Sequence, residues 1–112
     1  MVKPILPTLK EKKRYVVYEI LSQKNLDKNP SIEIVKKTKL FLGLFESAKA
    51  GLQSITYDQK LQRGVLRVSN KFVDKLKISL ALINDLEDGD VAIKSIGVSG
   101  ILKKAKNKYM AG

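Results

Sequence analysis

The chain has 112 residues, of which 44% are hydrophobic, a size that suits one domain with a small core. Twenty-two Lys and Arg residues against eleven Asp and Glu residues give a formal net charge of +11, which predicts attraction to a polyanion, either nucleic acid or an anionic membrane surface. The sequence contains no Cys and no His, which excludes disulfide bonds and removes the commonest metal ligand and general base. It also lacks a transmembrane-length apolar run and a signal-peptide pattern, so we expect a soluble, cytoplasmic protein with no membrane partner.

The first 14 residues carry two prolines and a basic cluster, and they predict an extended basic arm. Lys10, Lys12, Lys13 and Arg14 in this arm are candidates for contacts with a phosphate backbone. A solvated terminus without fixed structure is the alternative.

Residues 15–21, YVVYEIL, predict a central strand because their apolar character is nearly continuous. Its two tyrosines could belong to the core or stack on a base.

After Asn29-Pro30, apolar positions recur at helical spacing and predict a helix that ends or kinks at Gly43. The predicted buried positions of this helix are Ile34, Thr38, Phe41, Leu42 and Phe45. Leu40 and Leu44 fall outside this stripe and are candidates for a protein-partner interface.

Residues 52–57 and 64–69 predict a β-hairpin with a polar turn between the strands. Strict alternation places Gln53, Ile55 and Tyr57 on one face of the first strand. Lys60, Arg63 and Arg67 are the basic candidates of this hairpin. One face of the resulting antiparallel sheet should be covered and the other exposed to solvent.

Asn70 is the expected N-cap of a helix over residues 71–86, with Val73, Leu76, Leu80 and Ile83 buried and Phe72, Ile78 and Leu82 widening the stripe. The acidic residues Asp85, Glu87, Asp88 and Asp90 follow. They allow either a solvated turn or a metal site, although the spacing of oxygen ligands is not that of an EF-hand.

Residues 91–98 predict the last strand, in which Gly97 would allow another surface to approach the backbone closely. Residues 99–112 contain no acidic residue and predict a basic C-terminal tail. Lys103 and Lys104 are its candidates for phosphate contacts, and a frayed terminus is the alternative.

The order strand, helix, strand, strand, helix, strand predicts an α+β fold: a ferredoxin-like (RRM-like) βαββαβ sandwich over residues 15–98, with an antiparallel sheet and two helices on one face. RNA-recognition domains place stacking aromatics on the third strand after a basic residue and glycine. This chain has Arg63-Gly64, but Val65 and Arg67 where those aromatics belong. We therefore expect recognition of phosphates or shape through Lys and Arg, not ordinary reading of single-stranded RNA.

Four segments in order resemble the archaeal ribonuclease P protein component 2 family: residues 6–15 (LPTLKEKKRY), 48–52 (AKAGL), 64–68 (GVLRV) with Asn70, and 97–100 (GVSG) with the basic residues that follow. The resemblance implies a subunit of the ribonucleoprotein that removes the 5′ leader from precursor tRNA. It also implies a ferredoxin-like fold, pairing with protein component 3 in a two-plus-two heterotetramer, and further ribonuclease P proteins as partners. In that family the RNA carries the chemistry through bound Mg²⁺, so the protein itself would bind no cofactor and contribute no catalytic residue.

The resulting hypothesis is a ribonuclease P subunit that binds the catalytic RNA through phosphate contacts and meets precursor tRNA only indirectly. The proposed RNA-binding residues are Lys10, Lys12, Lys13, Arg14, Lys60, Arg63, Arg67, Lys103 and Lys104, with Leu40 and Leu44 at the partner interface. Two alternatives stay open: a general or ribosome-associated RNA-binding module, and a metal-dependent nuclease built on the acidic turn.

Overall fold

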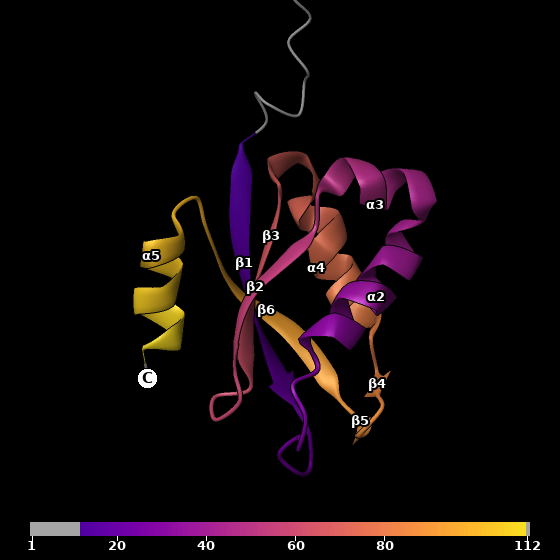
Figure 1. Cartoon of the computed structure of the whole chain (residues 1–112), viewed down its shortest axis with the longest axis vertical. Coiled ribbons are helices and arrows are strands. Elements are labelled where there is room, and N and C mark those ends of the chain that lie inside the picture. The colour runs from indigo at the N-terminus through magenta and orange to yellow at the C-terminus, as the bar shows by residue number, and fades with distance from the viewer. Residues whose placement is uncertain (1–11, 112) are drawn as a thin grey trace, which may run out of the picture.

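A four-stranded antiparallel sheet forms the centre of the molecule (Figure 1). The computed structural model describes residues 12–111. The strands are β1 (Lys13–Leu21), β2 (Gln53–Asp58), β3 (Arg63–Ser69) and β6 (Ala92–Ser99), in the spatial order β2-β3-β1-β6. The nearly continuous apolar strand β1 is central, as predicted, and the strand order agrees with the predicted ferredoxin-like fold.

Helices α2 (Ser31–Leu42) and α4 (Val73–Leu82) cover one face of the sheet, and α3 (Leu44–Ala50) follows α2 directly (Figure 1). The main core lies between these helices and the sheet, and its fully buried members include Val16, Tyr18, Ile20, Ile34, Leu66, Val68, Leu76 and Leu80. None of the helices within residues 12–111 combines the length and apolar character needed to cross a membrane.

Glycines set the ends of α2 and α3. Gly43, with φ of 85°, separates the two helices as predicted, and Gly51, with φ of 61°, ends α3. The change of direction at Gly43 breaks the helical phase, so the prediction that Phe45 is buried is wrong: its exposure is 79%. Phe41 is also half exposed, because it lines a groove beside α4 instead of packing on the sheet.

Helix α4 begins later and ends earlier than predicted. Asn70 opens a 3₁₀ turn, Asn70–Phe72, and no side-chain hydrogen bond caps α4, so the predicted N-cap is wrong. Leu76 and Leu80 face the sheet one turn apart, which leaves Ile78 and Leu82 exposed on other sides of the helix. The acidic segment that follows forms a small hairpin of β4 (Asp85–Leu86) and β5 (Gly89–Asp90).

Part of the stretch predicted as a tail is helical. Helix α5 (Leu102–Ala105) continues into a π-helical turn, Lys106–Met110, and packs on the face of the sheet opposite α2 and α4 (Figure 1). The sheet is therefore covered on both faces rather than on one. Strand β1 also includes Lys13 and Arg14, two residues assigned to the arm from sequence.

Irregular pairing occurs in both edge strands. The register of β2 against β3 shifts between Ser54 and Thr56, which marks Ile55 as the extra residue of a β-bulge. Ile55 therefore packs on the α5 side, whereas Tyr57 packs in the main core, and the prediction that they share a face is wrong. Strand β6 has a corresponding shift, with Gly97 and Ser95 opposite consecutive residues of β1.

Candidate nucleic-acid interface

The α5 face of the sheet has its own small apolar cluster. Val17 of β1, Val65 of β3 and Ala105 of α5 are fully buried at its centre. Gly97 allows the ring of Tyr109 to lie directly against β6, because a Cβ atom there would overlap that ring. The close approach predicted at Gly97 is confirmed. RNA-recognition domains carry a stacking aromatic at the position of Val65. Here Val65 packs instead against Ala105 of α5 in this apolar cluster.

Helix α5 and its π-helical turn together form the C-terminal helical segment, residues 102–110, and the outer side of this segment is strongly basic. Its four lysines, Lys103, Lys104, Lys106 and Lys108, are all exposed, and residues 91–112 contain no acidic residue. The apolar side of the same segment contacts the sheet, so the lysines point to solvent. Such a row of cations can neutralise successive phosphates of a nucleic acid. Lys106 and Lys108 were not selected as phosphate contacts in the sequence analysis. The helical spacing of the apolar residues Leu102 and Ala105 is the signal that could have placed these lysines on the exposed side of a helix.

Arg14, at the start of β1, lies near the loop that precedes α5. A Cβ atom placed on Gly100 would lie 3.5 Å from Nη1 of Arg14, so the guanidinium lies beside the loop that leads into α5. Lys12 is exposed at the same end of the sheet, and Lys13 is half-buried beside Gly51. The structure thus brings part of the basic arm and the first turn of α5 to one end of the sheet, whereas Lys10 lies outside the described residues.

Arg63 has protein partners. Its Nε donates to Glu19 Oε2 at 2.9 Å, and its Nη1 donates to the backbone oxygen of Tyr109 at 2.9 Å. Lys94 approaches the other oxygen of Glu19 at 3.9 Å. These contacts attach the end of the C-terminal helical segment to the sheet, so the geometry gives Arg63 a structural role.

Arg67 differs from Arg63 although the two lie on the same face of β3. Its side chain is half-buried, and its Nε is buried with no hydrogen-bond acceptor among the described residues. A buried donor without an acceptor is costly, and the guanidinium of Arg67 is not held at this atom by any partner among the described residues, in contrast to that of Arg63.

Lys60 lies in the β2–β3 turn. Asp58 Oδ1 fixes this turn by accepting hydrogen bonds from the backbone N–H groups of Lys60 and Leu61 at 2.9 and 3.0 Å. Lys60 and Lys106 line one groove of about 670 Å³ between the turn and the end of the C-terminal helical segment. The hairpin candidate therefore lies near the basic face of that segment.

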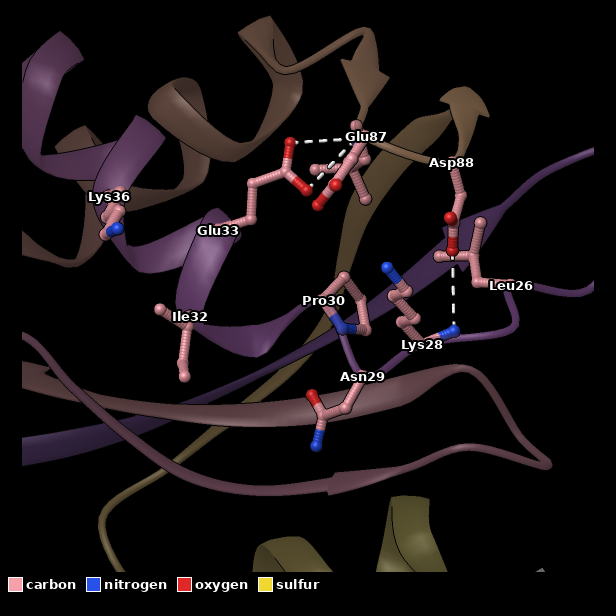
Figure 2. Close-up of a pocket in the computed structure, with 10 residues that line it drawn as sticks. Leu26, Lys28, Asn29, Pro30, Ile32, Glu33, Lys36, Glu87 and Asp88 are labelled. Atoms are coloured by element: carbon pink, nitrogen blue, oxygen red, sulfur yellow. Dashed lines mark hydrogen bonds between the residues drawn. The ribbon is translucent and has the colours of Figure 1, made fainter.

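The β4–β5 hairpin lies at the opposite end of the sheet from the start of β1 (Figure 1), and it carries the acidic residues Asp85, Glu87, Asp88 and Asp90. A pocket of about 260 Å³ lies there, between this hairpin and the start of α2 (Figure 2). Both carboxylate oxygens of Glu33 accept from the backbone N–H of Glu87, at 3.0 and 2.9 Å, and Asp88 accepts from the backbone N–H of Lys28 at 3.4 Å (Figure 2). Within residues 12–111, no three acidic side chains come together as a set of metal ligands.

Several apolar side chains of residues 40–45 and of α4 are exposed, and we refer to them together as the apolar patch. Leu40 and Leu44 are 80% and 81% exposed, and Phe45, Ile78 and Leu82 are exposed on the same three helices. Lys75 of α4 hydrogen-bonds Glu46 of α3 at 2.7 Å, which lowers the pKa of that carboxyl group and fixes the two helices beside the patch. Exposed apolar area of this kind is typical of surfaces that bind proteins, membranes or ligands.

The strand order and the basic C-terminal helical segment define the class of the protein: an RRM-like α+β domain whose sheet face is covered by a lysine-bearing helix. The chain belongs to the Rpp14/Pop5 family, whose model matches residues 14–110. It is 33% identical over 106 residues to ribonuclease P protein component 2 of Thermococcus gammatolerans, covering 94% of this chain and 88% of that protein. It is 36% identical over 111 residues to the protein of the same name from Methanocaldococcus jannaschii, covering 98% and 81%.

A solved structure shares the fold. One chain in the cryo-EM structure of yeast ribonuclease MRP matches with a TM-score of 0.64 at 11% identity, over 88% of this chain and 91% of that chain. At this identity the likeness supports the fold alone.

Proposed function

We propose that this chain is a protein subunit of ribonuclease P that binds and stabilises the catalytic RNA for removal of the 5′ leader from precursor tRNA. The observation that carries the proposal is the similarity to ribonuclease P protein component 2 along nearly the whole chain. The RNA would carry the chemistry with its own Mg²⁺, and this chain would supply positioning contacts.

The proposed phosphate contacts come from basic residues of the N-terminal arm, the hairpin and the C-terminal helical segment, and all of them except Lys10 lie within the described residues. They are Lys10 and Lys12 to Arg14 near the N-terminus, Lys60 and Arg67 of the hairpin, and Lys103, Lys104, Lys106 and Lys108. Arg63 is left out because Glu19 and Tyr109 hold its guanidinium. Each contact would add affinity that weakens with salt.

For the protein partner, we propose that the apolar patch around Leu40 and Leu44 binds ribonuclease P protein component 3, in an assembly with two copies of each protein. The patch lies on α2, α3 and α4, on the other side of the sheet from α5 (Figure 1). One chain could therefore contact RNA and protein at the same time.

Reconstituted cleavage tests the proposal. Precursor tRNA is incubated with ribonuclease P RNA at moderate Mg²⁺, with component 3 alone and then with this chain added. We expect stimulation that requires both proteins. The control protein carries Asp88→Asn and Asp90→Asn, which should stimulate equally, since these carboxylates have no role in the proposal.

Two other results would redirect the assignment. No stimulation, together with equal affinity for unrelated RNAs, would indicate a general RNA-binding module. Cleavage by the chain in the absence of RNA subunit, lost in the Asp88→Asn, Asp90→Asn protein, would indicate a metal-dependent nuclease.

A further inference from the structure

One row of side chains crosses the sheet at the margin of α5. Gln53 pairs with Arg67, Arg67 with Tyr15, and Tyr15 with Ser99, so the row runs across all four strands. Residues paired directly across antiparallel strands project from the same face. Tyr15 packs against the cluster of Val17, Val65 and Ala105, which identifies this face as the α5 side.

Helix α5 covers the neighbouring row and leaves this one partly open. The neighbouring row contains Val17, Val65 and Gly97, all of which lie under the C-terminal helical segment. In the row at the margin, Gln53 is exposed and Tyr15 and Arg67 are half-buried. The uncovered part of the sheet face is thus narrow, with an aromatic ring and a guanidinium paired at its centre.

The chemistry of this pair suits a nucleobase. Unstacked RNA bases bind on aromatic rings and on arginine guanidinium planes. Arg67 is half-buried, and its Nε has no acceptor among the described residues, so no protein group there holds its guanidinium by a hydrogen bond at that atom. Tyr18, the other tyrosine of β1, is fully buried on the opposite face and is unavailable for stacking.

The surroundings add charge for the backbone of the same nucleotide. Only Gly100 and Ile101 separate Ser99 from α5, whose first turn carries the exposed Lys103 and Lys104. A nucleotide on the Tyr15–Arg67 pair would therefore have these two lysines nearby for its phosphates.

We propose that Tyr15 and Arg67 form a platform for one unpaired RNA base, an inference that rests on the proposed RNA-binding function. RNA-recognition domains stack two or three bases on their open sheet. Here α5 occupies the rest of the face, so the platform has room for a single base.

The test separates base contacts from phosphate contacts. Binding of the full chain to an eight-nucleotide oligouridylate is compared, at one salt concentration, with binding to an abasic oligonucleotide of the same length and backbone. The wild-type chain should prefer the oligouridylate by about tenfold, the scale of one base–aromatic stack. Tyr15→Leu, which keeps apolar packing under α5, should abolish the preference, and Tyr15→Phe, which keeps the ring, should retain it.

Arg67→Lys provides a second variant in case Tyr15→Leu disturbs folding. It keeps the charge and removes the planar guanidinium, so it should reduce the base preference while affinity for the abasic oligonucleotide stays within twofold. Equal wild-type affinity for the two oligonucleotides, or a preference that survives in both variants, overturns the platform. The cleavage assay above decides the proposed function separately, because stimulation by the wild-type chain does not depend on a base preference for oligouridylate.

Discussion

Tyr18 and Tyr57 lie side by side in the main core, with ring centroids 6.4 Å apart. The hydroxyl groups of both are buried and lack hydrogen-bond partners among the described residues. Burial, followed by the influence of Tyr57, raises the pKa of Tyr18 above its usual range. Burial, followed by the negative charge of Asp58, raises the pKa of Tyr57 to about 12. Both phenols therefore remain protonated in the folded protein at pH values where an unfolded chain ionises.

This difference predicts alkaline sensitivity. Below about pH 10 both states hold the phenolic protons, so the stabilisation is complete; above pH 10 the unfolded state ionises first and stability falls as pH rises. For Tyr18 the free energy of unfolding should fall by about 1.4 kcal/mol per pH unit once the unfolded state ionises and the folded state does not. Tyr18→Phe should match the wild-type free energy of unfolding at pH 8.5, because the hydroxyl has no partner, and should lose less stability by pH 11.5 in urea titrations. Parallel curves for the two proteins would contradict the prediction.

The two hairpin arginines show what the sequence reveals at the scale of a residue. Arg63 and Arg67 lie four residues apart on one face of the same strand, and both are basic, so the sequence predicts similar roles for them. Their difference depends on Glu19 and on the backbone of Tyr109, which are 44 and 46 positions away from Arg63 in the chain. Contacts between residues so distant in sequence follow from the fold and have no local pattern.

At the scale of an element, the π-helical turn that follows α5 packs closely on the sheet at Gly97. A side chain at Gly97 would overlap the ring of Tyr109, so Gly97→Ala should destabilise the protein by about 1–2 kcal/mol, a typical cost of overpacking. Gly100→Ala is the matched control, because a Cβ atom there would meet Arg14 at an ordinary contact distance of 3.5 Å. Urea unfolding measures both, and a Gly97→Ala protein as stable as the control would contradict the packing of Tyr109 on β6.

The elements also differ in how far the sequence predicts them. Strand β1, the hairpin and the two helices on one face have strong apolar periods, and all were predicted. Helix α5 was missed because its apolar residues are few and interrupted by lysines, so charge dominates the local pattern. The bulge at Ile55 was missed because strict alternation assumes unbroken pairing, and one extra residue reverses every later side chain in the strand.

At the scale of the whole molecule, charge and apolar area are distributed over different sides. The lysines of the C-terminal helical segment lie on one side of the sheet, the exposed apolar patch on the helices of the other side, and the acidic hairpin at one end (Figure 1). A net charge of +11 would attract RNA from any direction, but the acidic end disfavours phosphate there. This distribution suggests that RNA binding and protein binding can be removed independently.

Two pairs of variants test that independence. Lys103→Gln with Lys104→Gln should reduce the slope of log affinity for ribonuclease P RNA against log salt by about two units, if each lysine meets one phosphate. Lys36→Gln with Lys39→Gln removes the same charge from exposed positions of α2 and should leave the slope nearly unchanged.

Leu44→Asp should abolish co-elution with component 3 in gel filtration, because it places a charge in the apolar patch, while the salt slope stays at the wild-type value. Ile32→Asp is the matched control for partner binding, since Ile32 is also exposed but lies in the first turn of α2, away from the patch. If Leu44→Asp lost RNA affinity and partner binding together while remaining folded, the two surfaces would not be independent.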